Sequence, residues 1–257
     1  MKFSLPLHHT FGPHVTSAFT NSAWNALKTF VLKGDEEEPR TILEQSLEQH
    51  FSAPVRLFAL GREALLAGLQ TLSLKPGDEV IVQGYTCVVV PNAIRAAGGI
   101  PVFADIDPET LNLTRETTEV VLSPRTRAII CQHTFGIPAP INELRALCNE
   151  RNILLIEDCA HMIPEKITEG GIGNVGDMMI LSFGKDKAIS GIVGGAIVIR
   201  NAKFCEPIFQ LAKHAHALSK ITVIRILLYP IRMTWIVRPL VGTILGRIIL
   251  RIMKECR

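Results

Sequence analysis

The feature that most limits the fold of this chain is a regular alternation between residues 56 and 199. Short apolar runs alternate there with amphipathic patterns of helical period. Strands that alternate with helices at this spacing form a mostly parallel sheet with helices on both faces. We therefore expect an α/β protein with three layers, α/β/α. The expected strands are residues 56–60, 79–82, 101–106, 127–133, 153–156, 178–182 and 196–199, and the expected helices are 62–72, 88–97, 114–122 and 141–149.

Segments of different character flank this region. Residues 1–55 contain two helical patterns, at 15–32 and 41–51, with a charged break between them. Residues 206–257 are apolar and basic. The sequence thus predicts an N-terminal helical segment (1–55), a large α/β domain (56–205) and a helical tail (206–257).

The composition is that of a globular protein, with 47% hydrophobic and 20% charged residues. The first residues lack the apolar core and cleavage pattern of a signal peptide. The six cysteines lie mostly inside apolar patterns and show no CxxC spacing. This favours free thiols in a reducing compartment over a disulfide framework or a metal site. We expect a cytoplasmic protein without a bound metal.

The tail carries a concentrated positive charge. Residues 221–257 hold seven Lys or Arg and one Glu, whereas the rest of the chain is weakly acidic. The Ile and Leu content of the segment favours a membrane surface over nucleic acid, which we do not expect as a partner. No uncharged run reaches the ~18 residues that cross a bilayer, and Pro230 and Pro239 are expected to break the segment into short helices. Peripheral membrane contact through residues 221–254 and packing against further protein sequence both remain open.

Chemically informative side chains directly follow the apolar runs of the expected strands. Binding sites in parallel sheets lie outside the carboxyl ends of the strands. Asp158 and His161 follow one such run, and Lys185 and Lys187 follow another. A pyridoxal phosphate enzyme requires two groups. One is an amine that reacts with the aldehyde, and the other is a carboxylate that holds the pyridinium nitrogen protonated. Residue type alone leaves the choice between the two lysines open.

A candidate phosphate site precedes the first helix of the α/β region. Gly61 and Arg62 stand where that helix begins, and the free N–H groups and dipole of a helix N-terminus favour an anion. The hydroxyl of Ser182, at the end of a strand, is a further candidate. The alternative is a plain turn with a surface arginine and a turn hydroxyl.

Several segments, in this order, resemble the sugar aminotransferases of the DegT/DnrJ/StrS type, which are pyridoxal phosphate enzymes of fold type I. The similarity runs from about residue 56 to residue 201. It rests on segments that resemble the family's "GPGDEVIVP", "PVFVDIDP", "HLYG" and "EDAAQ" or "EDAAH", which are residues 74–82, 101–108, 133–136 and 157–161 here.

The resemblance implies two catalytic residues and one neighbour. The family's lysine that binds the aldehyde of pyridoxal 5'-phosphate stands five residues after the serine of an "SF" pair, which makes it Lys187 here. Asp158 matches the residue that pairs with the pyridinium nitrogen. His161 would lie beside the phenolic oxygen of the cofactor.

The resemblance also implies the remaining cofactor contacts, with two departures. Ser182, Gly61 and Arg62 would hold the phosphate, although the family's "SGT" turn reads Leu60-Gly61-Arg62 here. Cys87 stands where the family usually has an aromatic residue that stacks on the cofactor ring.

The implied activity is amino transfer from an amino acid, most often glutamate, to a keto sugar that carries a nucleotide. The family forms homodimers with sites at the interface, and its C-terminal small domain is expected to be missing here or replaced by helices. Two other functions remain open. One is a dehydratase of the same family, in which histidine usually replaces the residue at Lys187. The other is an inactive scaffold that docks on membranes through its basic apolar tail.

Overall fold

The computed structural model describes residues 15–33, 38–165, 171–215, 217–237, 243, 246 and 248. The chain forms two compact units. One combines Met1–Pro39 with Ala217–Arg257, and the other is Arg40–His216. The larger unit contains the predicted range 56–205 and also the helices on either side of it. A division of the chain at residues 55 and 205 stays a prediction.

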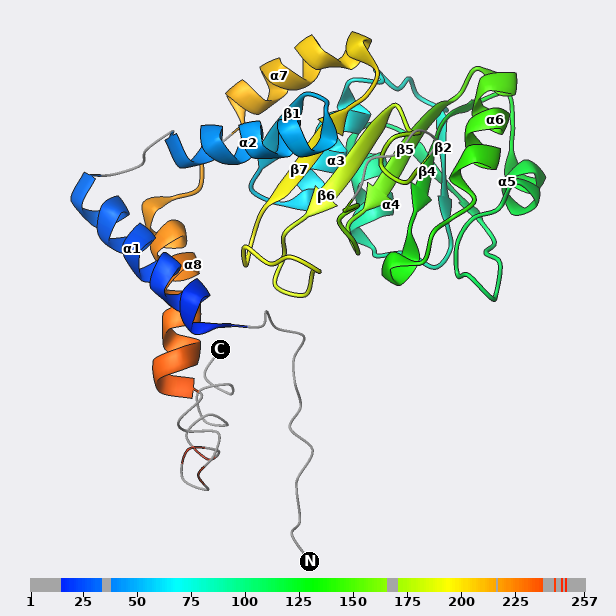
Figure 1. Cartoon of the computed structure of the whole chain (residues 1–257). Helices are drawn as coiled ribbons and strands as arrows, with labels where there is room; N and C mark the ends of the chain where they lie inside the picture. The colour runs from blue at the N-terminus through cyan, green and yellow to red at the C-terminus, as the bar shows by residue number, and fades with distance from the viewer. Residues whose placement is uncertain are drawn as a thin grey trace, which may run out of the picture. The chain divides into compact units, whose positions relative to one another are not determined.

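The larger unit is built around a sheet of seven strands in the order β1-β7-β6-β5-β4-β2-β3. Strands β2 to β6 run parallel, whereas β7 is antiparallel to both of its neighbours, β6 and β1 (Figure 1). The predicted mostly parallel sheet is confirmed. The strands are β1 (Val55–Phe58), β2 (Glu79–Gln83), β3 (Ile100–Ala104), β4 (Thr126–Gln132), β5 (Leu154–Cys159), β6 (Met178–Ser182) and β7 (Gly195–Ile199).

Helices cover both faces of this sheet, so the predicted three layers are confirmed. Alternate residues of each strand point to opposite faces. Met178 and Ile180 pack with α3 on one face, whereas Met179 and Leu181 pack with the end of α2 on the other. The helices of this unit are α2 (Glu38–Phe51), α3 (Gly61–Gln70), α4 (Val89–Ala96), α5 (Arg115–Val121), α6 (Ile141–Arg151) and α7 (Cys205–His214), with short 3-10 turns η1 (Thr134–Gly136) and η2 (Ala202–Phe204).

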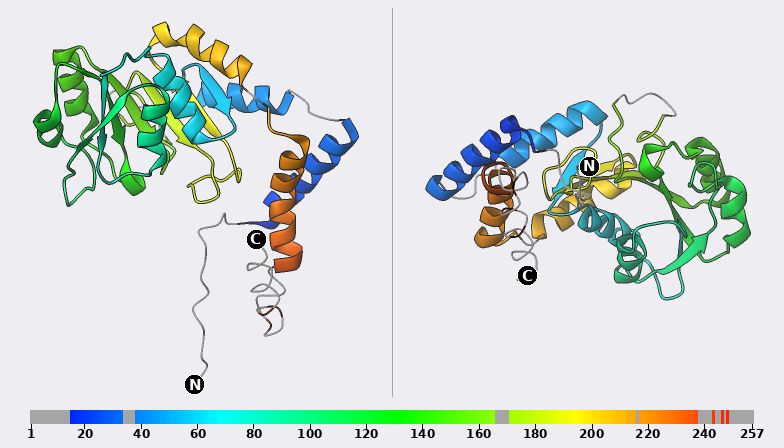
Figure 2. Two further views of the ribbon diagram at one scale, coloured as in Figure 1. Left: turned by 180° about the vertical axis from the view of Figure 1, so that it is seen from behind. Right: turned by 90° about the horizontal axis from the view of Figure 1, so that it is seen from below.

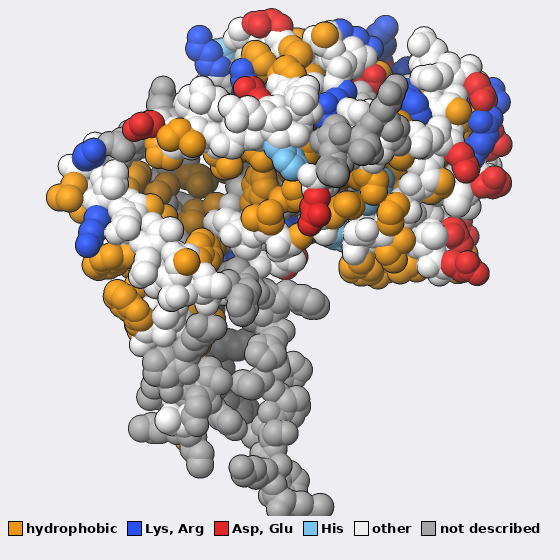
Figure 3. Space-filling model, viewed as in Figure 1, with side chains coloured by type: hydrophobic (Ala, Val, Ile, Leu, Met, Phe, Trp, Pro, Cys, Tyr) orange, Lys and Arg blue, Asp and Glu red, His pale blue; other side chains and the backbone are white. Residues whose placement is uncertain are grey.

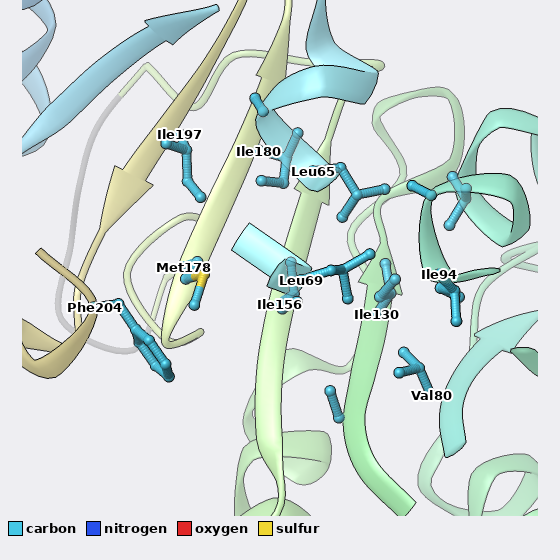
Figure 4. Packing of buried hydrophobic residues seen from close by; sticks show 14 of the residues in the cluster. Leu65, Leu69, Val80, Ile94, Ile130, Ile156, Met178, Ile180, Ile197 and Phe204 are labelled. Atoms are coloured by element: carbon cyan, nitrogen blue, oxygen red, sulfur yellow. The ribbon is translucent and has the colours of Figure 1, made fainter. Parts of the chain in front are cut away.

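The largest buried cluster lies between the sheet and helices α3, α4 and α7. Leu65 and Leu69 of α3 project onto Ile130, Ile156 and the neighbouring strands (Figure 4). A second cluster on the opposite face joins α6 to β4 and β5 through side chains that include Leu144 and Leu147. Close packing in these two clusters fixes the strands in place, and a site at the strand ends requires such a fixed support.

The smaller unit pairs α1 (Ser17–Lys33) with α8 (Lys220–Arg232) and the π-helical turn η3 (Met233–Val237). The two helices lie side by side in all views (Figures 1 and 2). The hydroxyls of Thr20 and Thr234 are hydrogen-bonded at 2.7 Å across the pair. No helix in the described part of the chain is long and apolar enough to cross a membrane.

The prediction that Pro230 breaks the tail was wrong. The α8 helix continues through Pro230 to Arg232 and passes directly into η3. Proline removes a donor and crowds the carbonyl one turn earlier. The helix continues nevertheless, with Pro230 and Ile231 as its buried residues, and α8 packs against α1. Pro239 lies outside the described residues. The helix α7, at the start of the predicted tail, belongs to the α/β unit.

Candidate functional site

A cavity of about 190 Å³ opens at the carboxyl ends of β4, β5 and β6. Its walls come from the start of α3, the residues before α4, the ends of the three strands and the loop that leads to β7. All seven residues predicted from the sequence line this one cavity: Gly61, Arg62, Cys87, Asp158, His161, Ser182 and Lys187. Lys187 is among the lining residues and Lys185 is not.

Asp158 lines the cavity from the face of β5 that points toward α3. Its side chain is buried and accepts a hydrogen bond from the N–H of Ala160 at 2.9 Å. Burial raises the pKa of this carboxyl, while that hydrogen bond and the positive charges of His161 and Lys187 oppose the rise. Because water is excluded, the carboxylate gains most from a cationic or N–H donor placed in the cavity.

Lys187 projects from the loop between β6 and β7. Its backbone N–H donates to the carbonyl of Gly184 at 3.2 Å, which closes a turn directly after the strand. The side chain is 18% exposed, and its Nζ lies 4.0 Å from Oδ2 of Asp186. The amine is therefore partly shielded from water while it faces the cavity, an arrangement that suits a reactive lysine.

His161 is held in one orientation by Phe135 of η1. The backbone N–H of Phe135 donates to Nδ1 of His161 at 3.1 Å, and the two rings are stacked with centroids 5.4 Å apart. Since Nδ1 accepts, the proton of the neutral ring sits on Nε2. Burial lowers the pKa of His161, and the charge of Lys187 adds to the shift. The imidazole therefore offers one N–H donor at neutral pH.

The start of α3 is brought against the ends of β6 and β7 by glycines. A Cβ on Gly61 would meet the Cβ of Ser182 at 2.9 Å, and a Cβ on Gly195 would lie 2.4 Å from the backbone of Gly61. The first N–H groups of a helix have no partner within it, and Leu60 provides no side-chain cap. Gly61, Arg62 and Ser182 all line the cavity, and the close approach of Gly61 to Ser182 places the start of α3 beside the Ser182 hydroxyl.

A separate cluster stabilises the site from the opposite face of β5. Glu157 is fully buried and accepts hydrogen bonds from the backbone N–H groups of Gly173, Val175 and Gly176. It also faces Nε2 of His133 at 3.4 Å. Burial alone would raise the pKa of Glu157, but these hydrogen bonds outweigh it and the pKa is lowered.

The same cluster has a geometry that a metal ion could use. Ligand atoms of His133, Glu157 and Cys159 lie within 4.8 Å of one another. However, Nδ1 of His133 accepts the N–H of Ala139, so its Nε2 carries the proton that points at Glu157. Burial raises the pKa of Cys159 well above its ordinary value, which keeps it a thiol. Hydrogen bonds account for this cluster, and we assign no metal to it.

Several lining or supporting residues were not identified from the sequence. Gln132 lines the cavity and is held by the hydroxyls of Thr86 and Thr134. Phe135 orients His161, and its positive φ of 53° was not foreseeable from residue type. The pair Gly194-Gly195 was visible in the sequence, but its contact with Gly61 depends on how β7 meets α3.

The sequence matches the DegT/DnrJ/EryC1/StrS aminotransferase family over residues 43–238. It is 36% identical over 141 residues to the UDP-N-acetyl-3-dehydro-alpha-D-glucosamine 3-aminotransferase of Acidithiobacillus ferrooxidans, covering 55% of this chain and 38% of that protein. It is also 36% identical over 138 residues to the GDP-perosamine synthase of Vibrio cholerae, which covers 54% of this chain and 38% of that protein. The chain thus spans 38% of the length of each of these relatives.

Solved structures share the fold. The crystal structure of NtdA from Bacillus subtilis with bound cofactor PMP superimposes with a TM-score of 0.72 at 23% identity, covering 84% of this chain and 55% of that one. PseC of Helicobacter pylori, an aminotransferase of pseudaminic acid biosynthesis, superimposes with a TM-score of 0.71 at 18% identity. The match covers 86% of this chain and 64% of PseC. At these identities the likeness concerns the fold, whereas the sequence match covers most of the chain. The chain therefore belongs to the DegT/DnrJ/EryC1/StrS aminotransferase family.

Proposed function

We propose that this chain binds pyridoxal 5'-phosphate in the cavity at the strand ends and transfers an amino group from an amino acid to a keto sugar. The observation that carries the proposal is the meeting of Lys187 and Asp158 in one cavity, the first from the loop after β6 and the second from the end of β5. The family is one of pyridoxal phosphate enzymes. A nucleotide-linked acceptor is suggested by relatives such as GDP-perosamine synthase, and glutamate is the donor that we propose.

The residues present fit the cofactor. Asp158 is a buried carboxylate whose pKa is raised by burial, so a pyridinium N–H would relieve the cost of its charge. The start of α3, without a side-chain cap, and the adjoining Ser182 hydroxyl suit a phosphate group. Arg62 adds a cation with a planar set of donors at the same place.

When bound, the cofactor supplies an aldehyde for amines and a protonated ring that stabilises negative charge. This chain's residues supply the rest. Lys187 would provide the amine that holds the cofactor, and the free amine would accept the proton that leaves the substrate carbon. Asp158 keeps the ring nitrogen protonated. His161, whose Nδ1 accepts from the N–H of Phe135, would offer its Nε2–H to the cofactor's phenolic oxygen. We further propose a homodimer, because the resemblance to the family implies one.

Borohydride trapping tests the proposal directly. The protein with pyridoxal phosphate should develop a visible imine band, and reduction followed by peptide mapping should place the label on Lys187. Lys185→Ala is the matched control and should retain both signals, because Lys185 does not line the cavity. A Lys187→Ala protein that is still labelled at the cavity would contradict the assignment, and label on Lys185 would reverse it.

A further inference from the structure

We propose that the surface of the helical pair, defined as α1 together with α8 and η3, binds an anionic lipid bilayer in the plane of its interface. This inference concerns the smaller unit and is independent of the proposed amino transfer.

The charge of the helical pair is of one sign. Residues 17–33 contain two lysines, and residues 220–237 contain Lys220, Arg225 and Arg232, with no Asp or Glu in either segment. Helices that face only water usually intersperse both signs. The sequence from residue 221 onward continues this bias, with seven Lys or Arg against one Glu. An anionic surface is the complementary partner, and cytoplasmic leaflets carry such a charge.

Large apolar side chains of the same helices face outward. Leu32 is 82% exposed and Ile221 is 64% exposed, and Val31, Trp235 and Ile236 are also exposed. In Figure 3, hydrophobic side chains coloured orange and basic side chains coloured blue both lie on the described part of this unit. Single exposed apolar residues are ordinary, but a group of them on one helical pair marks an interaction surface. Apolar residues beside cations are the composition of interfacial helices.

The two tryptophans of the chain lie together in this unit. Trp24 of α1 and Trp235 of η3 have ring centroids 5.8 Å apart, and Nζ of Lys28 lies 5.3 Å from the Trp24 centroid. Tryptophan is enriched where a protein meets the headgroup layer, because the ring is apolar and its N–H needs a polar partner. None of the described helices can cross a bilayer, so contact in the plane of the interface is the geometry that fits.

The tryptophans make a sharp test possible, because all tryptophan emission reports on the helical pair. The full chain is mixed with phosphatidylcholine vesicles, and with vesicles that also contain phosphatidylglycerol. We expect a blue shift and co-flotation with the anionic vesicles, and weakening of both by salt. Absence of a shift and of flotation with anionic vesicles would overturn the proposal. Equal binding to both vesicle types would overturn its electrostatic part.

A charge-matched pair of variants separates the helical pair from general surface charge. Lys220→Gln, Arg225→Gln and Arg232→Gln together should weaken partitioning roughly a hundred-fold, at the usual contribution of a cation near an anionic membrane. The control is Lys75→Gln, Arg95→Gln and Lys213→Gln, which removes the same charge from exposed positions of the larger unit. Equal losses in the two triple variants would contradict a site on the helical pair.

The apolar contribution to membrane binding is tested at exposed residues whose side chains do not pack in the core. Leu32→Ser with Ile221→Ser should reduce binding that survives at high salt, and far-ultraviolet circular dichroism should be unchanged because both side chains are exposed. A second copy of the chain is the competing occupant of this surface. A blue shift that grows with protein concentration without lipid, and that anionic vesicles do not increase, would show self-association and overturn the proposal.

Discussion

Gly195 approaches Gly61 so closely that a Cβ added to Gly195 would lie 2.4 Å from both the Cα and the N of Gly61. The first strand residue of β7 thus touches the first helical residue of α3, backbone against backbone. This contact sets the place of the α3 N-terminus beside Ser182. The candidate phosphate site therefore depends on a residue that does not line the cavity.

Gly195→Ala should displace the start of α3, because no flexible side chain can move aside for the added methyl. We expect a loss of about 1–3 kcal/mol in the free energy of unfolding and weaker binding of pyridoxal phosphate. Urea denaturation and cofactor titration measure these two effects. Gly84→Ala is the control, since its methyl would meet only an ordinary contact of 3.6 Å. Equal stability of the two variants would contradict the role given to Gly195.

Asp158→Asn should separate stability from activity. The raised pKa of Asp158 means that the folded chain binds this proton more tightly than the unfolded chain, so stability falls as pH rises above the unfolded value of 3.8. At neutral pH the charge destabilises the cofactor-free protein. The variant should therefore melt at a higher temperature without cofactor, while amino transfer drops on the order of a hundred-fold or more. A lower melting temperature with full activity would refute the assignment.

His161→Phe should change how stability depends on pH. Burial and the charge of Lys187 lower the pKa of His161, opposed by Asp158 and Asp186, so the folded chain resists protonation of this ring. The unfolded chain takes up the proton as pH falls through about 6.5, and the folded state loses stability in that range. Phenylalanine can keep the stacking on Phe135 without titrating. Between about pH 7.5 and about pH 5.5, the melting temperature of the variant should fall less than that of the unchanged protein. Equal falls in melting temperature for the two proteins would contradict this.

Glu157→Gln should be strongly destabilising, although Glu157 lies on the face of β5 away from the cavity. The amide cannot replace a carboxylate that accepts three backbone N–H groups and faces His133. We expect a loss of about 3 kcal/mol in the free energy of unfolding, measured by urea denaturation. Because the pKa of Glu157 is lowered, its contribution is present above the unfolded value of 4.5 and is lost as pH falls below it. The difference in the free energy of unfolding between the unchanged protein and Glu157→Gln should therefore become smaller in acid. A difference that does not depend on pH would argue against a charged Glu157.

Local pattern was enough to predict much of this protein. The apolar runs before Asp158 and Ser182 are too short for typical helices, and their length favours strands. Parallel strands expose their carboxyl ends together, so the residue types at those ends indicated the cofactor. Asp158, His161, Ser182 and Lys187 were predicted in this way, whereas Gly61 and Arg62 were predicted from a helix N-terminus and Cys87 from the resemblance to the family. All seven line one cavity.

Tertiary structure decided what depends on contacts between distant parts of the chain. The apolar run of β7 reads the same in either direction, so its antiparallel placement was not visible locally. Lys185 and Lys187 share one loop, and only the turn closed at Gly184 directs the second toward Asp158. The stacking of Phe135 on His161 and the contact of Gly195 with Gly61 join residues 26 and 134 positions apart. Sequence periodicity records which way a side chain faces within its own element, whereas the neighbour that it meets there is chosen by how the elements pack.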